Sequence, residues 1–252
     1  MTYMKQALVL PVLVVMISVL VFSAQNAMAL TTTIQDKISC QSAPISGVWT
    51  AATKTCTVGT LVIGPGDTVG IAKHVILSIG TVTSSGVIKN NGTIVIAIGG
   101  VITTSGTVIN NGLIASQGTM TNSGPFNNFG SITSTGTITN DPTGTITTNG
   151  RISSTGTITS SGSIIVNSHG ALSNFGGVMT NTLNIVNHGT IKTSGTFTNS
   201  GPVTNTGVIA NKGLITNSNT ITNSGNIVDL CGGTITNSGT ISGHTVIEKC
   251  VV

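Results

Sequence analysis

The chain has 252 residues, of which only 6% are charged and 3% are aromatic, and it carries 33 glycines and four cysteines. Globular domains have about a quarter charged residues, so this composition excludes an ordinary globular core. A hydrophobic fraction of 38% equally excludes a typical disordered chain. The net charge of +4 comes from few groups, which argues against nucleic acid as a partner.

The first thirty residues have the pattern of an export signal. A short start with one positive charge, Met1–Lys5, precedes an apolar run over residues 7–22, and Ala27-Met28-Ala29 follows as a small-x-small cleavage site. The apolar run is shorter than the roughly 20 residues that span a bilayer. We expect residues 1–29 to be a cleaved signal peptide and the protein to be secreted or on the cell surface. An uncleaved signal anchor is the alternative, and this segment would then be the only membrane contact.

The body of the chain is one repeated six-residue unit. Between Gly80 and Gly239 we count 26 units of the form Gly, x, apolar, x, often Asn, x. The first position is Gly in 24 units, the third is apolar in all 26, and the fifth is Asn in 14. The exceptions at the first position are Leu183 and Asn219. Such regularity indicates a repeat architecture rather than a biased composition.

The chemistry of the unit predicts one short strand and one corner. One apolar residue in six is too sparse for an amphipathic helix, whereas Thr, Ile and Val favour extended backbone. Gly and Asn tolerate the positive φ that we expect at each corner. Stacked coils bury each apolar residue against its equivalent about 4.8 Å above and below. We therefore predict an all-β fold, a single-stranded parallel β-helix with three units per 18-residue coil over residues 61–243.

Longer units mark the places where the coils accept extra residues. Units of eight residues begin at Gly92, Gly136, Gly162 and Gly225, and Gly170 begins one of seven. We expect these insertions at corners. Asparagines at the fifth position are likewise expected at corners, hydrogen-bonded to one another along a ladder.

The non-repetitive ends are predicted to be caps over residues 30–60 and 244–252. Cys40 and Cys56 lie in the first segment, and Cys231 and Cys250 lie near the other end. Four cysteines permit three connectivities, but a bond between the two ends would have to span the whole solenoid. We predict the disulfides Cys40–Cys56 and Cys231–Cys250, which would staple caps over strand edges that otherwise invite polymerisation.

The repeat resembles two kinds of β-helix. Its hexad is similar to that of left-handed β-helices, whereas the phrase Asn237-Ser-Gly-Thr-Ile241 looks like the repeats of filamentous-haemagglutinin and autotransporter passengers, which are right-handed. The resemblance covers about residues 60–243 and leaves the handedness open. It implies a surface-exposed or adhesive protein, although left-handed hexapeptide β-helices also include acyltransferases and zinc carbonic anhydrases.

The residues that an enzyme or a metal site would need are scarce. The histidines are His74, His169, His188 and His244, and only His169 and His188 are spaced to share a corner of adjacent coils. The acidic residues Asp36, Asp67, Asp141, Asp229 and Glu248 are scattered along the chain. We therefore expect no catalytic residue, no metal and no cofactor.

The most informative pattern is a threonine row on one face. In every third unit from Gly80 the fourth position is always Thr, and the second position is Thr in six of nine cases. Both positions point outward, because the apolar third position points inward. The candidate binding face comprises Thr81, Thr83, Thr103, Thr119, Thr121, Thr137, Thr139, Thr157, Thr159, Thr180, Thr196, Thr198, Thr216, Thr234 and Thr236.

Two functions follow from this face. The first is a rigid, non-catalytic structural or adhesive module whose partner is a surface, a carbohydrate or another solenoid. The alternative is ice binding, because the row resembles the Thr-x-Thr face of β-helical antifreeze proteins. Bulky or charged substitutions at Thr121, Thr139 and Thr159 should abolish ice activity without loss of the fold.

Overall fold

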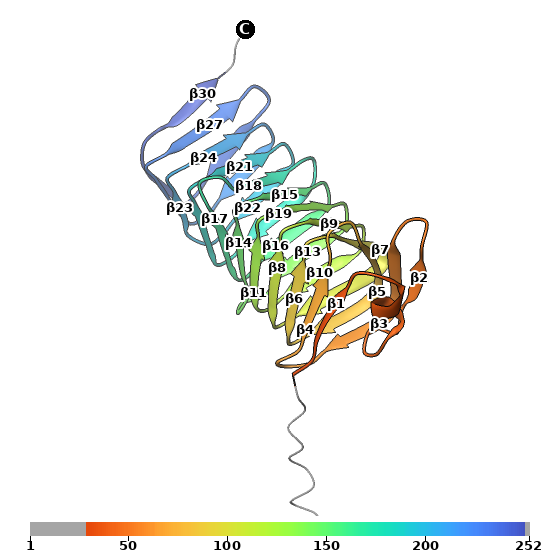
Figure 1. The fold of residues 1–252 in the computed structure, drawn as a ribbon. Coiled ribbons are helices and arrows are strands. Elements are labelled where there is room, and N and C mark those ends of the chain that lie inside the picture. Colours follow the sequence, from red (N-terminus) through yellow and green to blue (C-terminus); the bar gives the residue numbers. More distant parts are fainter. Residues whose placement is uncertain (1–28, 250–252) are drawn as a thin grey trace, which may run out of the picture.

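Each repeat unit forms a short strand followed by a corner, as the sequence predicts (Figure 1). The computed structural model describes residues 29–249; the remaining part of the predicted signal peptide and residues 250–252 lie outside the described residues. Every strand of the solenoid pairs in parallel with the strand one coil further on, as Thr121 does with Thr139 eighteen residues later. This pairing confirms a parallel β-solenoid with three strands per coil.

Three faces run along the solenoid. The face that carries the predicted threonine row, called the threonine face from here on, crosses the second halves of three long strands and then seven short ones. These are β3 (Thr55–Ile63), β5 (Ile76–Ser84), β7 (Thr93–Thr104), β10 (Thr119–Asn122), β13 (Thr137–Asn140), β16 (Thr157–Ser160), β19 (Val178–Asn181), β22 (Thr196–Asn199), β25 (Leu214–Asn217) and β28 (Thr234–Asn237).

The second face is a sheet of eleven strands. They are β1 (Thr31–Ile34), β4 (Thr68–Ile71), β6 (Val87–Asn90), β8 (Thr107–Asn110), β11 (Pro125–Asn128), β14 (Thr145–Thr148), β17 (Ser163–Val166), β20 (Asn184–Asn187), β23 (Val203–Asn205), β26 (Thr220–Asn223) and β29 (Thr240–Gly243).

The third face begins with the first halves of β3, β5 and β7, which bend from this face onto the threonine face. It continues through β9 (Leu113–Ser116), β12 (Ser131–Ser134), β15 (Arg151–Ser154), β18 (Ala171–Asn174), β21 (Thr190–Thr193), β24 (Val208–Asn211), β27 (Asn226–Leu230) and β30 (Val246–Lys249).

The core is a stack of third-position side chains. From Val82 to Ile227 each of them is at most 5% exposed. Burial of one such side chain contributes about 1.5–3 kcal/mol, so the stack stabilises every coil in the same way. Because each coil contacts only its neighbours, the molecule is an elongated column (Figure 1).

Glycine occupies the first position of the repeat for a different reason from the one that the sequence suggested. Positive φ occurs at Gly66, Gly99, Gly176, Gly232 and Gly243, none of which begins a hexad, and at none of the described asparagines. At Gly106, by contrast, a Cβ would overlap the carbonyl oxygen of Gly86 in the coil below. The first position is therefore Gly because the backbones of successive coils approach too closely for a side chain, and the positive-φ expectation for the corners was wrong.

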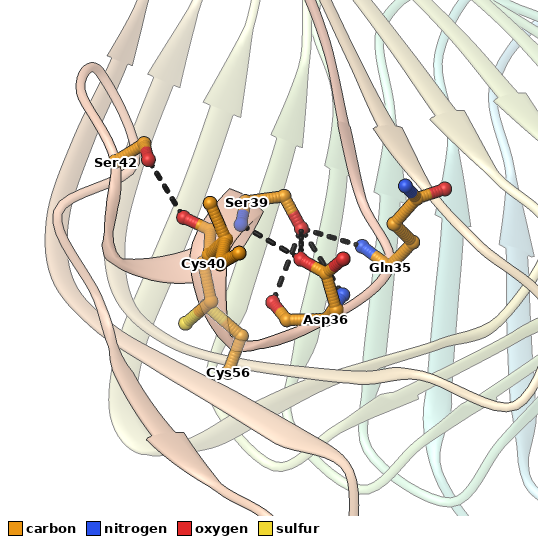
Figure 2. Close-up of a disulfide and its surroundings, with 7 residues drawn as sticks. Gln35, Asp36, Ser39, Cys40, Ser42 and Cys56 are labelled. Atoms are coloured by element: carbon orange, nitrogen blue, oxygen red, sulfur yellow. Dashed lines mark hydrogen bonds between the residues drawn. A yellow bond between two sulfur atoms is a disulfide. The ribbon is translucent and has the colours of Figure 1, made fainter.

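The N-terminal end of the solenoid is covered by a small cap within residues 30–60. It contains the helix α2 (Lys37–Gln41) and the strand β2 (Val48–Thr50), which pairs antiparallel with β3. The buried disulfide Cys40–Cys56 ties α2 to β3 (Figure 2). The predicted disulfide at this end is therefore present.

A capping box begins the helix α2. The Asp36 carboxylate accepts hydrogen bonds from the backbone N–H and the hydroxyl of Ser39, each at 2.8 Å (Figure 2). The Ser39 hydroxyl in turn accepts from the backbone N–H of Asp36 at 3.1 Å. The pKa of Asp36 is lowered below its ordinary value, mainly by the hydrogen bond from the backbone N–H of Ser39 and next by that from the Ser39 hydroxyl. The capping box stabilises this short helix because it provides acceptors for backbone N–H groups that have no partner within the helix.

The C-terminal end continues the solenoid as far as the structure describes it. Residues 244–252 are predicted to be a cap, but β30 within them pairs in register with β27 and extends the third face. Cys231 is exposed, and its predicted partner Cys250 lies outside the described residues. Among residues 29–249, no helix is long and apolar enough to cross a membrane.

Candidate binding face

The threonine row predicted from the sequence forms one continuous, in-register ladder. Each fourth-position threonine pairs with the next, from Thr83 with Thr103 to Thr216 with Thr236. The intermediate pairings join the same positions of β7, β10, β13, β16, β19, β22 and β25. The grouping of every third unit is therefore confirmed, and the hydroxyls and methyls repeat about every 4.8 Å along the column.

All fifteen candidate residues lie on this face with their side chains half-buried or exposed. In the described part of the chain, no charged side chain projects from the ten strands of the face. The charged residues of the solenoid lie elsewhere, for example Lys89 on the second face and Arg151 and Lys192 on the third. The face therefore offers hydroxyl and methyl groups and no ionic contact.

Four apolar side chains interrupt the threonines. Val101, Val178 and Leu214 occupy the second position, and Val62 occupies the fourth position of β3. Val62 is 65% exposed, Val178 45% and Leu214 38%. The face is therefore a mixed surface in which apolar spots stand at fixed places among hydroxyl groups.

The first rung of the face crosses the predicted boundary between the cap, residues 30–60, and the solenoid, because β3 begins at Thr55. Thr60 and Val62 of β3 pair with Thr81 and Thr83 of β5. The run Gly59-Thr60-Leu61-Val62 has the same Gly, x, apolar, x order as the later units. That order was the available signal, and with this rung the face has ten.

Asparagine ladders lie inside the column and link each coil to the next. All fifth-position asparagines except Asn237 are buried at strand ends and point inward, which corrects the expectation that they lie at the corners. In one ladder Asn181 Nδ2 donates to Asn199 Oδ1 at 2.8 Å, and Asn199 Nδ2 donates to Asn217 Oδ1 at 2.7 Å. The second proton of Asn199 Nδ2 goes to the carbonyl of Gly201 at 2.7 Å. Turned inward, the Asn199 amide is satisfied by the next coil and by the backbone carbonyl just after its own strand.

Each ladder has a direction, and in several ladders the first acceptor lacks a donor. Asn122 and Asn181 both have a buried Oδ1 with no hydrogen-bond partner. Below Asn181 lies Ser160, whose hydroxyl donates to Gly162 instead. Each amide donates toward the C-terminal end, so the coil below supplies no donor to the first asparagine of a ladder. At Asn90 and Asn211 a backbone N–H, that of Gly92 or Gly213, takes this place at 3.1 Å.

The candidate metal ligands do not gather. His169 and His188 lie at the corner between the second and third faces, after β17 and β20, as predicted. His188 Nδ1 is 2.7 Å from the Thr206 hydroxyl, whereas His169 Nδ1 is 3.3 Å from that of Ser168. Within the described residues, no group of three or more His, Cys, Asp or Glu side chains could hold a metal ion.

One pair of acidic residues is less scattered than the sequence suggested. Asp229 and Glu248 are register partners on β27 and β30. They line a hollow of about 460 Å³ at the C-terminal end. Asp229 also accepts a hydrogen bond from Asn211 Nδ2 at 2.7 Å, so it continues an asparagine ladder.

Comparison with known proteins identifies one stretch of the column. Residues 57–124 match the family model of the haemagglutinin repeat. They begin within β3 and reach just beyond β10, which covers the first rungs of the threonine face. Searches of curated proteins and of solved structures gave no match. The chain is thus a parallel β-solenoid, and part of it is similar to the haemagglutinin repeat, in line with its resemblance to filamentous haemagglutinin.

Proposed function

We propose that this protein is a non-catalytic, secreted or cell-surface module that acts as a rigid rod and adheres through its threonine face. The observation that carries the proposal is the charge-free ladder of threonines, kept in register over the column. Haemagglutinin-repeat solenoids are typically structural or adhesive proteins of the cell exterior. The buried disulfide Cys40–Cys56 fits an oxidising compartment.

A surface of this kind suits partners that are broad and uncharged. Threonine presents a methyl and a hydroxyl group on a stiff side chain, so little side-chain entropy is lost on contact. Many weak contacts at a fixed spacing add up along a rigid rod. Carbohydrate, an abiotic surface or another solenoid each fits this description.

Retention of the purified chain on immobilised polysaccharides and on uncharged solid surfaces tests the proposal. The informative variant is Thr137→Lys with Thr139→Lys on β13, which places two charges in the middle of the threonine face. Its matched control is Thr145→Lys with Thr147→Lys on β14, which has the same Thr-Ile-Thr order on the second face. We expect loss of retention for the first variant only. Equal retention of both variants would reject the face as the contact surface.

Ice binding is the second candidate, and one observation favours it. On the successive strands β10, β13 and β16 both outward positions are Thr, so an uninterrupted Thr-x-Thr array covers three rungs. Thermal hysteresis and ice-crystal shaping test this candidate directly. A freezing gap that disappears in the Thr137→Lys, Thr139→Lys variant would establish it, and an absent gap in the folded parent would remove it.

A further inference from the structure

The apolar side chains on the threonine face lie on rungs that are symmetric about one central strand. Its ten strands can be numbered as rungs 1 to 10 from β3 to β28. Val62 lies on rung 1 and Leu214 on rung 9, while Val101 lies on rung 3 and Val178 on rung 7. Both pairs are therefore equidistant from rung 5, which is β13.

The corner beside the face repeats the same symmetry. Ile98 lies between the third face and the threonine face on rung 3 and is 84% exposed. Phe175 lies at the same corner on rung 7 and is 39% exposed. Each is followed by a glycine with positive φ, Gly99 or Gly176. These two insertions therefore place an apolar side chain at matching distances from β13.

The geometry points to an antiparallel dimer in which two copies of this chain pack threonine face against threonine face. A twofold axis that runs parallel to the strands, between the copies and over β13, brings each rung n against rung 10 − n of the other copy. Positions along the strand are preserved by this rotation. Val101 then meets Val178 of the second copy, and Ile98 meets Phe175.

The remaining rungs are equally compatible with this arrangement. Rung 4 meets rung 6, so Thr119 and Thr121 face Thr157 and Thr159. Leu214 of rung 9 faces Thr60 of rung 1 and is offset from Val62 by two residues along the strand, about 7 Å. Since the face has no charged residue, no like charges oppose one another. An isologous contact needs such self-complementarity, because one patch must serve as both partners.

The available area predicts a weak dimer. Nine overlapping rungs of four-residue strands measure roughly 40 Å by 13 Å, which is about 500 Å² on each copy. The pair then buries about 1,000 Å², at the lower limit for a specific interface. We therefore expect a dimer that dissociates on dilution. The inference rests on the proposed function, since it names a second copy as the partner of the same face.

Charged substitutions at two residues that face each other across the dimer test its register. Dimerisation of each variant is measured by sedimentation velocity over a range of concentrations. In the variant Thr121→Lys with Thr159→Lys, the introduced lysines of one copy face those of the other, and dimerisation should weaken by at least ~100-fold. In the variant Thr121→Lys with Thr159→Glu, each introduced charge faces its opposite, and the dimer should return. A matched control on the second face, Thr147→Lys with Thr204→Lys, should behave as the parent.

The outcomes separate this inference from the proposed function. A parent chain that stays monomeric at its solubility limit, or a dimer indifferent to the lysine pair, would overturn the dimer. If surface retention is still lost in the Thr137→Lys, Thr139→Lys variant, the proposed function stands without the dimer. Failure of the glutamate variant to restore the dimer, with its fold intact, would reject the antiparallel register.

Discussion

Two residue types explain why the hexad has its composition, and both act inside the column. Asparagine fills the fifth position because a buried carboxamide can donate and accept along the stack. Glycine fills the first position because the carbonyl of the coil below leaves no space for a Cβ. The sequence predicted the ladder but not its buried place, since a strand-end residue can turn inward or outward without a change in the repeat.

A break in the middle of a ladder should be costly. Asn199→Ala removes the acceptor of Asn181 Nδ2 and leaves Asn217 Oδ1 with only the distant backbone N–H of Asn219, at 3.4 Å. Since a buried polar group that loses its partner costs about 1–3 kcal/mol, we expect the free energy of unfolding to fall by about 2–4 kcal/mol in urea titrations. The control Asn237→Ala, at an exposed ladder end, should cost less than about 1 kcal/mol. Similar losses for both would contradict the ladder's role.

The close approach of successive coils at the first-position glycines can be tested by substitution with alanine, with another glycine as the control. Gly106→Ala places a methyl group against the carbonyl of Gly86 and should destabilise the fold by at least about 2 kcal/mol. At Gly59 nothing lies within 4 Å of an added Cβ, and its φ is not positive. Gly59→Ala should therefore stay within about 0.5 kcal/mol of the parent. Thermal unfolding of the two variants side by side checks both values, and a tolerated Gly106→Ala would show that the coils can separate.

At the scale of elements, the strands were predictable and the ends were not. Periodicity located the units from Gly80 onward because every coil meets the same steric demands. Residues 30–60 contain no repeat, so α2 and the antiparallel β2 could not be placed from pattern alone. The predicted disulfide followed from cysteine positions and the separation of the two ends. The strand β30 escaped prediction because Val246–Lys249 lacks the leading Gly and the Asn of a unit.

The cap should loosen locally when its disulfide is removed. Cys40→Ala with Cys56→Ala opens a loop with a sequence separation of 16 residues, for which loop entropy predicts a loss of about 3 kcal/mol. Amide exchange of Gly47, which donates to the carbonyl of Cys40 at 2.7 Å, should accelerate more than about tenfold. Amides of β16 should be unchanged, because coils in a solenoid interact with their neighbours only. Equal acceleration in β16 would mean that the column unfolds as one unit.

At the scale of the whole molecule, the three faces share one backbone and differ in what they display. The threonine face is uncharged, whereas Arg151 and Lys192 project from the third face. The guanidinium of Arg151 lies 5.9 Å from the ring centre of Phe175. The sequence separated the faces because a fixed 18-residue period assigns each residue to one of them. It could not show that the apolar interruptions lie on rungs symmetric about β13, since that required the register of the long strands β3, β5 and β7.

The proposed function requires the protein to contact its partner through one of its three faces. A single coil provides the test, because Thr133, Thr139 and Thr147 occupy the same outward position on β12, β13 and β14. The measurement is the fraction of each single Thr→Lys variant that a binding surface retains, with circular dichroism to verify the fold. We expect the surface to retain the Thr133→Lys and Thr147→Lys variants like the parent and to lose the Thr139→Lys variant. Retention of Thr139→Lys, or equal loss of all three, would contradict the proposed function.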